Sequence, residues 1–335
     1  MEGDALSIRP GNGVEVFGEE VTCRFDPHRI SSTGINCISH AHSDHLPRGF
    51  EGDGAMASRI TLRCASERLG RKLREEGSPH IQMLDAGHIR GSRMFLLNGG
   101  TKVLYTGDMC PEDRFGMKGA KPVKADALII ESTYGSRGWD FPPREEIGAV
   151  IRDWVVDSLA QDFSVALMTY PLGKSQLLLD FLGGLEPYLI DNVLCSTQWV
   201  EEEGGERFRY RAVPEVAVRS PSLYICSTGA RKGEVLQRLQ RGKLRTAFIS
   251  GWALRRGFFH NMRVDEGFPL SDHAGHRELL SFVKGCDPKV VYTNHGFDEE
   301  LASGITKELG IEARSLKSLR KKEGAKGSQK KLAEF

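Results

Sequence analysis

Long apolar runs are missing from this 335-residue chain, in which no stretch approaches the roughly 18 uninterrupted apolar residues of a membrane-spanning helix. The amino-terminal residues Met1–Asp4 also lack the basic and apolar regions that open a secretory signal. Both absences argue against membrane insertion and secretion. We therefore expect a soluble, cytoplasmic protein with no membrane partner.

Closely spaced cysteines are absent as well. The seven cysteines are scattered along the chain, and no two of them stand in C-x-x-C spacing. An odd number of dispersed cysteines argues against a disulfide framework, and their spacing argues against a zinc site made of thiolates. We expect most of these cysteines to be reduced residues of the core.

A strong overall charge is the third absence, since the formal net charge is only +1. This value gives no global electrostatic argument for binding nucleic acid, so any basic surface must be local. Basic residues are concentrated in residues 311–335, which hold eight Lys or Arg residues against three Glu. Because few apolar residues accompany them, this segment is expected to be a flexible basic tail.

Histidine and aspartate, in contrast, are concentrated at one point. The run His40-Ala41-His42-Ser43-Asp44-His45 follows the apolar segment Ile35–Ile38, and Pro47 and Gly49 come shortly after it. This order predicts a loop at the end of a strand. On such a loop His40 and His42 face one side, whereas Asp44 and His45 can turn toward a second metal ion about 3.5–4 Å from the first. The alternative is a surface histidine cluster without function.

The remaining pattern indicates a chain in two parts. Residues 1–135 read as short strands and turns with one helix near Ser66–Glu76, and 143–160 follow as an amphipathic helix. Strand–loop–helix repeats come next, for example Val165–Met168 followed by Lys174–Leu182. The sequence therefore predicts an α/β protein whose second part is a separate α/β domain.

Three further segments each place a potential ligand just beyond an apolar strand: Ala86–Ser92, Tyr105–Asp108 and Thr293–Gly296. Together with His40–His45 and Glu131–Gly135, these ordered motifs resemble those of the metallo-β-lactamase fold, specifically its β-CASP nucleases. The resemblance covers nearly the whole chain.

The resemblance implies a metallo-β-lactamase αββα sandwich with an inserted α/β β-CASP domain. The sandwich would comprise residues 1–135 and 266–310. Residues 136–265 would form the β-CASP domain, and 311–335 would remain as the flexible tail.

The resemblance also implies two divalent metal ions, with zinc expected and manganese as the alternative. One ion would be held by His40, His42 and His88, the other by Asp44, His45 and His295, with Asp108 bridging them. A water activated by both ions would attack the phosphodiester, with Asp44 counted among the catalytic residues. Glu131 would orient His273, which would protonate the leaving 3′ oxygen. The plainer alternatives are a solvated carboxylate for Glu131 and a mere helix start near His273.

Within the family, three segments are most similar to the ligase-associated, Artemis-like DNA exonucleases of prokaryotes: Thr169–Gln176, Ser250–Trp252 and Ser271–His273. They favour a single-strand DNA exonuclease of repair that works 5′→3′ and leaves 5′-phosphates. His295 disagrees, because RNA-acting members carry histidine there and eukaryotic DNA-acting members tend to carry an aliphatic residue. An RNA-processing β-CASP ribonuclease therefore stays open, and a non-catalytic scaffold or a small-molecule hydrolase is a further alternative.

The segment Gly173-Lys174-Ser175 precedes a predicted helix and is similar to the end of an ATP-binding P-loop. The earlier glycine of that motif is missing, since Met168 stands in its place. A helix start still favours an anion. The residues predicted to bind substrate phosphate here and after the next strand are Lys174, Ser175, Ser227, Thr228 and Arg231.

The last seven residues, Gln329–Phe335, fit the pattern Q-x-x-L-x-x-F, which resembles the peptide by which DNA repair enzymes bind the PCNA sliding clamp. One helical turn would put Leu332 and Phe335 on one face, with Gln329 at the rim. The alternative is a solvated tail with two stray apolar residues. A clamp peptide of this type implies an archaeal or eukaryotic origin, and the size of the chain favours an archaeal, nucleoid-associated protein.

Overall fold

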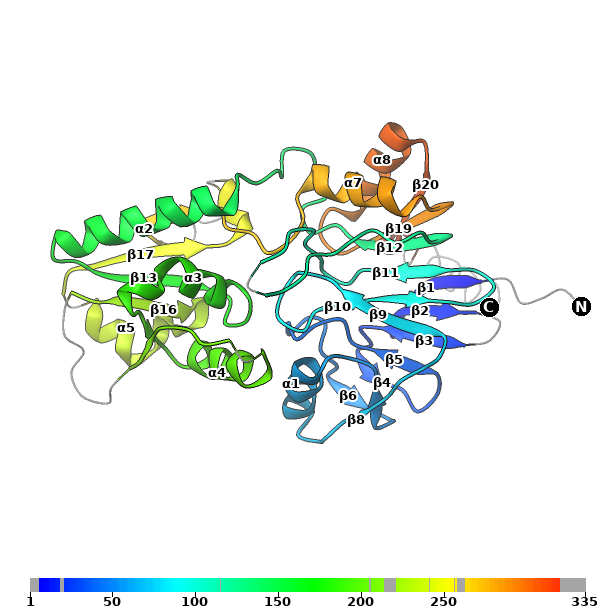
Figure 1. The fold of residues 1–335 in the computed structure, drawn as a ribbon, viewed down its shortest axis with the longest axis horizontal. Helices are drawn as coiled ribbons and strands as arrows, with labels where there is room; N and C mark the ends of the chain where they lie inside the picture. Colours follow the sequence, from blue (N-terminus) through cyan, green and yellow to red (C-terminus); the bar gives the residue numbers. More distant parts are fainter. Residues whose placement is uncertain are drawn as a thin grey trace, which may run out of the picture. The chain divides into compact units, whose positions relative to one another are not determined.

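The computed structural model describes residues 6–18, 21–114, 116–204, 206–213, 221–240, 242–255, 257 and 263–319, without the side chains of residues 231, 232, 234 and 238. The chain divides into two compact units (Figure 1). Unit 1 comprises residues 1–140 and 273–335, and unit 2 comprises residues 141–272. Unit 2 is thus inserted into the sequence of unit 1.

Unit 1 is built on two sheets. The first has the strand order β1-β2-β3-β5, formed by Ser7–Gly11, Gly13–Phe17, Thr22–Phe25 and Ile35–Cys37. The second has the order β20-β19-β12-β11-β10-β9, formed by Glu312–Ser315, Val290–Asn294, Ala127–Glu131, Val103–Tyr105, Arg93–Leu97 and Ile81–Asp85. Two short pairs complete the strands of this unit: β4 (Arg29–Ile30) with β6 (Gly49–Phe50), and β7 (Gly54–Ala55) with β8 (Arg74–Glu75).

The six-stranded sheet is apolar on both faces because it lies between two layers. In β10, Phe95 and Leu97 pack toward the four-stranded sheet, whereas Met94 and Leu96 pack toward α7 (His276–Cys286) and α8 (Asp298–Leu309). This period of two is the side-chain alternation of a strand. The predicted layered α/β architecture is confirmed.

The direction of the strands decides where the functional loops meet. Strands β11, β12 and β19 are parallel, and β9 runs the same way because both β9 and β11 are antiparallel to β10. The carboxyl ends of these four strands therefore lie at one edge of the sheet. Glu131 is the last residue of β12, and the loops that follow β9, β11 and β19 carry His88, Asp108 and His295.

Unit 2 is a parallel α/β unit. Its sheet has the order β15-β14-β16-β13-β17-β18, and every neighbouring pair is parallel. The strands are Arg211–Ala212, Tyr188–Leu189, Leu223–Ser227, Ser164–Thr169, Leu244–Ile249 and Glu266–Phe268. The helices are α2 (Arg144–Ala160), α3 (Lys174–Leu182), α4 (Asn192–Gly204) and α5 (Glu234–Leu239).

Two predictions about local structure are wrong. The helix expected near Ser66–Glu76 is α1 (Arg59–Leu69), which begins after Ser58 and ends at Gly70 in the left-handed conformation. The flexible tail expected from residue 311 is wrong at its start, because β20 (Glu312–Ser315) pairs with β19 along the sheet edge and Leu316 is buried. All seven cysteines lie within the described residues, where they form no disulfide, and six of them are buried.

Candidate metal centre

Four ligating side chains meet at the edge where the strands of unit 1 end. One ligand atom each from His40, His42, His88 and Asp108 lies within 4.8 Å of all the others. His88 Nε2 is 3.0 Å from His42 Nδ1, and His40 Nε2 is 3.4 Å from Asp108 Oδ2. His40, His88 and Asp108 are buried. The loop after β5 and the strand ends of the second sheet thus supply one compact donor set.

A second group of side chains adjoins the first through the same aspartate. His45 Nε2 lies 3.4 Å from Asp108 Oδ2 and 3.8 Å from Asp44 Oδ2. The His45 and His295 ring centroids are 4.7 Å apart. His295 has a φ of 64°, in the left-handed region. This backbone conformation is strained for a residue other than glycine, and such strain often accompanies functional sites. The other six predicted ligand residues therefore lie around Asp108.

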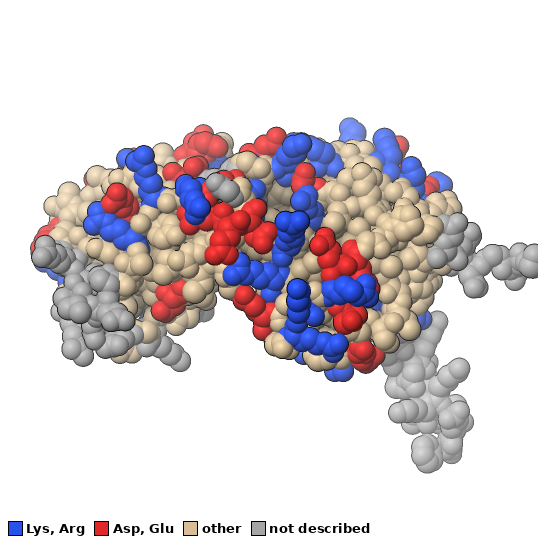
Figure 2. Space-filling model, turned by 60° about the horizontal axis from the view of Figure 1, so that its bottom comes forward, with Lys and Arg blue, Asp and Glu red and all other residues tan. Residues whose placement is uncertain are grey.

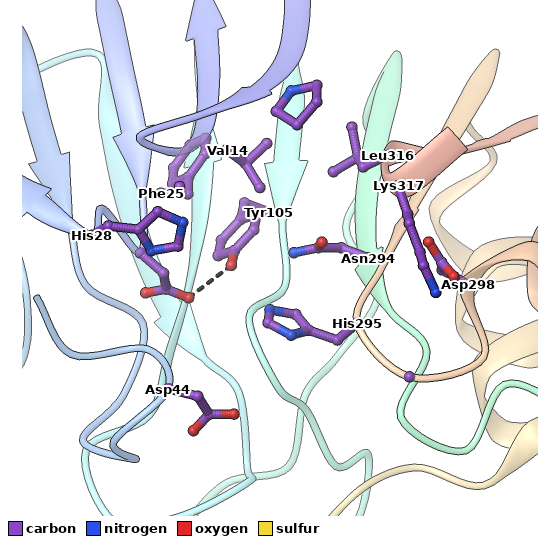
Figure 3. Close-up of a pocket in the computed structure, with 14 residues that line it drawn as sticks. Val14, Phe25, His28, Asp44, Tyr105, Asn294, His295, Asp298, Leu316 and Lys317 are labelled. Atoms are coloured by element: carbon purple, nitrogen blue, oxygen red, sulfur yellow. Dashed lines mark hydrogen bonds between the residues drawn. The ribbon is translucent and has the colours of Figure 1, made fainter. Parts of the chain in front are cut away.

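The side of the centre that carries Asp44 and His295 is accessible. A cavity of about 300 Å³ is lined by these two residues together with His28, Asn294 and Lys317 (Figure 3). This volume is at the lower end of the range for small-ligand pockets. The first four donors are largely buried, so the centre has one enclosed side and one open side.

The donor chemistry fits divalent metal ions. Among the described residues, His40 Nε2, His45 Nε2 and Asp108 Oδ1 are buried polar atoms with no hydrogen-bond partner. Such atoms are costly unless something binds them. Burial, and then the nearby His45, lower the pKa of His40 well below its usual range, so that its imidazole is neutral and can donate a lone pair. Imidazole nitrogens with a carboxylate are ligands that zinc favours.

The charge of Asp108 is favoured by the same histidines. Burial raises the pKa of this carboxyl, but His45 and His40 outweigh burial and hold the pKa well below its usual range. Asp108 is therefore an ionised carboxylate between the two groups of imidazoles. That is the position in which a ligand can bridge two cations.

Asp26 is a functional residue that the sequence analysis missed. Its Oδ2 lies 2.7 Å from His45 Nδ1 and accepts hydrogen bonds from Tyr105 OH and Ser39 Oγ. Its Oδ1 accepts one from the Ser39 backbone N–H. A carboxylate at Nδ1 holds His45 in the tautomer whose Nε2 is free to ligate a metal. The available signal was an aspartate directly after the alternating strand β3.

Glu131 and His273 are in contact, at the end of β12 and at the start of the chain's return to unit 1. Glu131 Oε2 is 2.9 Å from His273 Nδ1, and Oε1 accepts a hydrogen bond of 2.6 Å from the Met109 backbone N–H. Glu131 is buried, and one oxygen each from Asp108 and Glu131 and one ring nitrogen of His273 also lie within 4.8 Å of one another. The pair therefore belongs to the same centre as Asp108.

The predicted phosphate-binding residues are not available in the way expected. Lys174 is buried, and its ammonium group forms an ion pair with Asp272. Ser175 is buried as well and donates its hydroxyl to the Tyr170 carbonyl. Both side chains therefore have intramolecular partners, and phosphate binding by them stays a prediction. Thr228 is exposed and Ser227 is partly exposed, and phosphate binding by them stays a prediction. The side chain of Arg231 lies outside the described residues.

The clamp-binding residues Gln329, Leu332 and Phe335 also lie outside the described residues. The histidines that the sequence analysis left without a catalytic role include His276, which is buried with its Nδ1 2.7 Å from the Gly135 carbonyl oxygen. The structural role expected for His276 stays a prediction.

Comparisons with known proteins agree with this centre. Residues 261–316 match a family model described as "Zn-dependent metallo-hydrolase RNA specificity domain". A protein named "Probable DNA ligase" from Opitutus terrae is 33% identical over 291 residues, which is 82% of this chain and 28% of that protein. "Endoribonuclease YSH1" of Candida albicans is 36% identical over 153 residues, which is 45% of this chain and 16% of that protein. The chain belongs to the metallo-β-lactamase/β-CASP family.

The β-CASP chain thus spans less than a third of the length of these two relatives. A solved structure of a protein of unknown function from Enterococcus faecalis V583 matches with a TM-score of 0.58 at 11% identity. That match covers 92% of this chain and 97% of the other, and at this identity it shows the fold alone. Separately, no described helix of the β-CASP chain is long and apolar enough to cross a membrane.

Proposed function

We propose that this β-CASP protein is a metal-dependent nuclease that hydrolyses DNA phosphodiester bonds in DNA repair. The observation that carries the proposal is the arrangement of six further ligand residues around Asp108, beside the Glu131–His273 pair. A paired donor set suits phosphodiester hydrolysis, because two cations can neutralise the attacked phosphate and stabilise the leaving oxygen.

The ligand assignment follows the two groups of side chains. His40, His42 and His88 would hold the first ion, and Asp44, His45 and His295 would hold the second. Asp108 lies against both groups, since its Oδ2 is 3.4 Å from His40 Nε2 and from His45 Nε2. We assign zinc, with manganese as the alternative, because imidazole and carboxylate ligands serve both.

When bound, the ions supply an activated water and charge neutralisation at the phosphate. The chain's own residues handle the leaving group. Glu131 accepts a hydrogen bond from the Nδ1–H of His273, which leaves His273 Nε2 to carry the proton that the leaving 3′ oxygen needs. The Met109 N–H fixes the Glu131 carboxylate. Glu131 is therefore a positioning residue, and His273 is the general acid.

The Opitutus terrae relative favours DNA over RNA, because it matches 82% of this chain and its name is that of a DNA ligase. A nuclease beside a ligase suits repair, and we propose single-stranded DNA with 5′→3′ exonuclease polarity and 5′-phosphate products. Docking of the segment Gln329–Phe335 on a PCNA clamp belongs to the same proposal. His295 and the endoribonuclease relative favour the second candidate, an RNA-processing β-CASP ribonuclease.

The test is degradation of single-stranded DNA and RNA of one sequence, labelled at either the 5′ or the 3′ end, with Zn²⁺ or Mn²⁺. Wild type should shorten DNA from its 5′ end, and Asp108→Ala should abolish this. Asp53→Ala is a matched control because Asp53 is an exposed aspartate of the same unit. Cleavage of RNA alone would establish the second candidate, and DNA cleavage that survives Asp108→Ala would refute the metal assignment.

The Glu131–His273 step has its own test. Glu131→Gln should lower kcat while leaving the metal content unchanged, because Glu131 contacts His273 and the Met109 N–H. The limb of the pH–rate profile that reports the general acid should shift as well, because the carboxylate that stabilises the protonated imidazole is gone. An unchanged profile would remove His273 from the reaction.

A further inference from the structure

The surface beside the metal loop carries basic and aromatic side chains that the proposed centre does not use. It includes the exposed residues Arg68, Arg71 and Lys72 at the end of α1, and Phe50 at the end of β6. We call these four residues the α1 patch. We propose that the α1 patch binds the nucleic-acid strand on its way to the metal centre. This inference rests on the proposed nuclease function.

The first argument is the contact between the α1 patch and the metal loop. Arg68 Nη1 donates a hydrogen bond of 2.9 Å to the carbonyl oxygen of Ser43, between the proposed ligands His42 and Asp44. Ser43 and Asp44 are exposed, so this is the solvent side of the loop. A phosphate next to the one being cleaved would therefore come within reach of the Arg68 guanidinium.

The second argument is the charge that remains after ion pairing. Within residues 59–76, Arg63 pairs with Glu67, and Arg74 pairs with Asp53 and Glu76. The Lys and Arg residues of this part that have no carboxylate partner among the described residues are Arg59, Arg68, Arg71 and Lys72. Figure 2, with the underside of Figure 1 turned forward, shows Lys and Arg side chains gathered among acidic ones on this face. Unpaired guanidinium and ammonium groups bind phosphates.

The third argument is the aromatic ring. Phe50 is one of the few large apolar side chains that are exposed, at 37%, and the Arg71 guanidinium lies 4.7 Å from its ring centroid. Bases of single strands stack on aromatic rings and on guanidinium planes. A cation and a ring in one place offer a base-stacking platform together with a phosphate contact.

The patch is held in place by the end of α1. Gly70 adopts the left-handed conformation, and the Arg71 N–H donates to the Ser66 carbonyl at 3.1 Å. Leu73 is buried, and its N–H donates to Ser66 Oγ at 3.0 Å. The turn that presents Arg71 and Lys72 is therefore anchored on both sides, so that little ordering is needed when a strand binds.

The test measures binding to single-stranded DNA of about 12 nucleotides, a length that a single-strand groove covers. Fluorescence anisotropy is measured on full-length protein carrying Asp108→Asn, so that the strand is not degraded. In that background Phe50→Ala should weaken binding about 10-fold, and Phe50→Trp should restore it. Arg68→Ala should lower the slope of log Kd against log salt by about 0.7, the value for one phosphate contact on a single strand.

Arg74→Ala is the matched control, because it also removes one exposed guanidinium from this segment. Unlike Arg68, Arg74 already has two carboxylate partners, Asp53 and Glu76. Its affinity and salt slope should equal those of the parent. The inference would be overturned if the variant with alanine at Phe50, Arg68 and Arg71 together bound the strand as tightly as the parent. It would also be overturned if Arg74→Ala changed the affinity and the salt slope as much as Arg68→Ala.

Hydrolysis of bis(p-nitrophenyl) phosphate separates this inference from the proposed function. The small diester needs the metal centre but not the ring of Phe50, so Phe50→Ala in protein that keeps Asp108 should hydrolyse it at the wild-type rate. If wild type fails to hydrolyse it, the proposed function fails, and the binding titrations still decide whether the α1 patch holds a strand.

Discussion

Replacing Asp26 with Asn should weaken metal binding by the protein although Asp26 is not a ligand. The Asp26 Oδ2 atom lies 2.7 Å from each of His45 Nδ1, Tyr105 OH and Ser39 Oγ, so it serves three donors at once. An asparagine keeps one oxygen but places an NH₂ group at the other position. The two hydroxyls can rotate, whereas His45 can avoid the clash of donors only by moving its proton to Nε2. That tautomer blocks the atom assigned to the metal.

The size of the effect follows from the bond that is lost. A hydrogen bond to a charged group contributes about 1.5–3 kcal/mol. Because about 1.4 kcal/mol corresponds to a factor of ten, Asp26→Asn should weaken metal binding roughly 10- to 100-fold. Changes to partners of metal-ligating histidines in other proteins fall in the same range, about 10- to 100-fold.

The assay is competition for zinc with a chromophoric chelator, together with metal analysis and circular dichroism of each variant. Tyr105→Phe is the informative control, because it removes one donor to Asp26 and leaves the His45 contact in place. It should lower stability but leave metal affinity near that of wild type. An Asp26→Asn variant that is folded and binds zinc as tightly as wild type would refute the reasoning.

Three more predictions concern stability and partners. Lys174→Ala should lower the free energy of unfolding by about 3–5 kcal/mol in urea titrations, because it leaves a buried carboxylate without its cation, whereas removal of the exposed Lys243 should have little effect. Gly107→Ala should reduce both the free energy of unfolding and the zinc content, because the new Cβ would lie 2.5 Å from the Cβ of Ser39. Gly310→Ala is the control: its φ is similar but nothing lies within 4 Å of the new Cβ, so this variant should show only the cost of backbone strain. Deletion of Gln329–Phe335 should abolish binding to PCNA in surface plasmon resonance while hydrolysis of short DNA continues, and retained clamp binding would contradict the clamp assignment.

The contact that Lys174 makes shows what local sequence patterns leave out. The Gly173-Lys174-Ser175 segment does begin a helix, as predicted, because Lys174 opens α3. The partner of Lys174 is Asp272, 98 positions along the chain. A short motif reports the start of a helix, but it contains no information about which distant side chain reaches the same place. The motif therefore predicted the local structure correctly but not the contact that Lys174 makes.

The tail prediction failed for a related reason. The charges in residues 311–335 outweigh the few apolar residues, so composition alone indicates a disordered segment. In the structure, the backbone of Glu312–Ser315 pairs with β19, while Ile311 and Ala313 pack against the core of unit 1. An edge strand needs only backbone groups and alternate side chains, so a charged composition did not exclude it.

The sequence by itself determined the family, the layered α/β architecture and the residues that could bind metal. It could do so because His40–His45 places four ligands within six residues, and because each remaining ligand directly follows an apolar strand. Such signals are local, and they survive without knowledge of the fold.

Only the tertiary structure decided which side chains act on one another. Parallel strands β11, β12 and β19 bring Asp108, Glu131 and His295 to one edge, although the sequence separates the first from the last by 187 residues. Asp26 contacts His45, and Lys174 contacts Asp272, for the same physical reason. A buried polar group must find a partner in three dimensions, and the fold rather than the neighbouring sequence selects that partner.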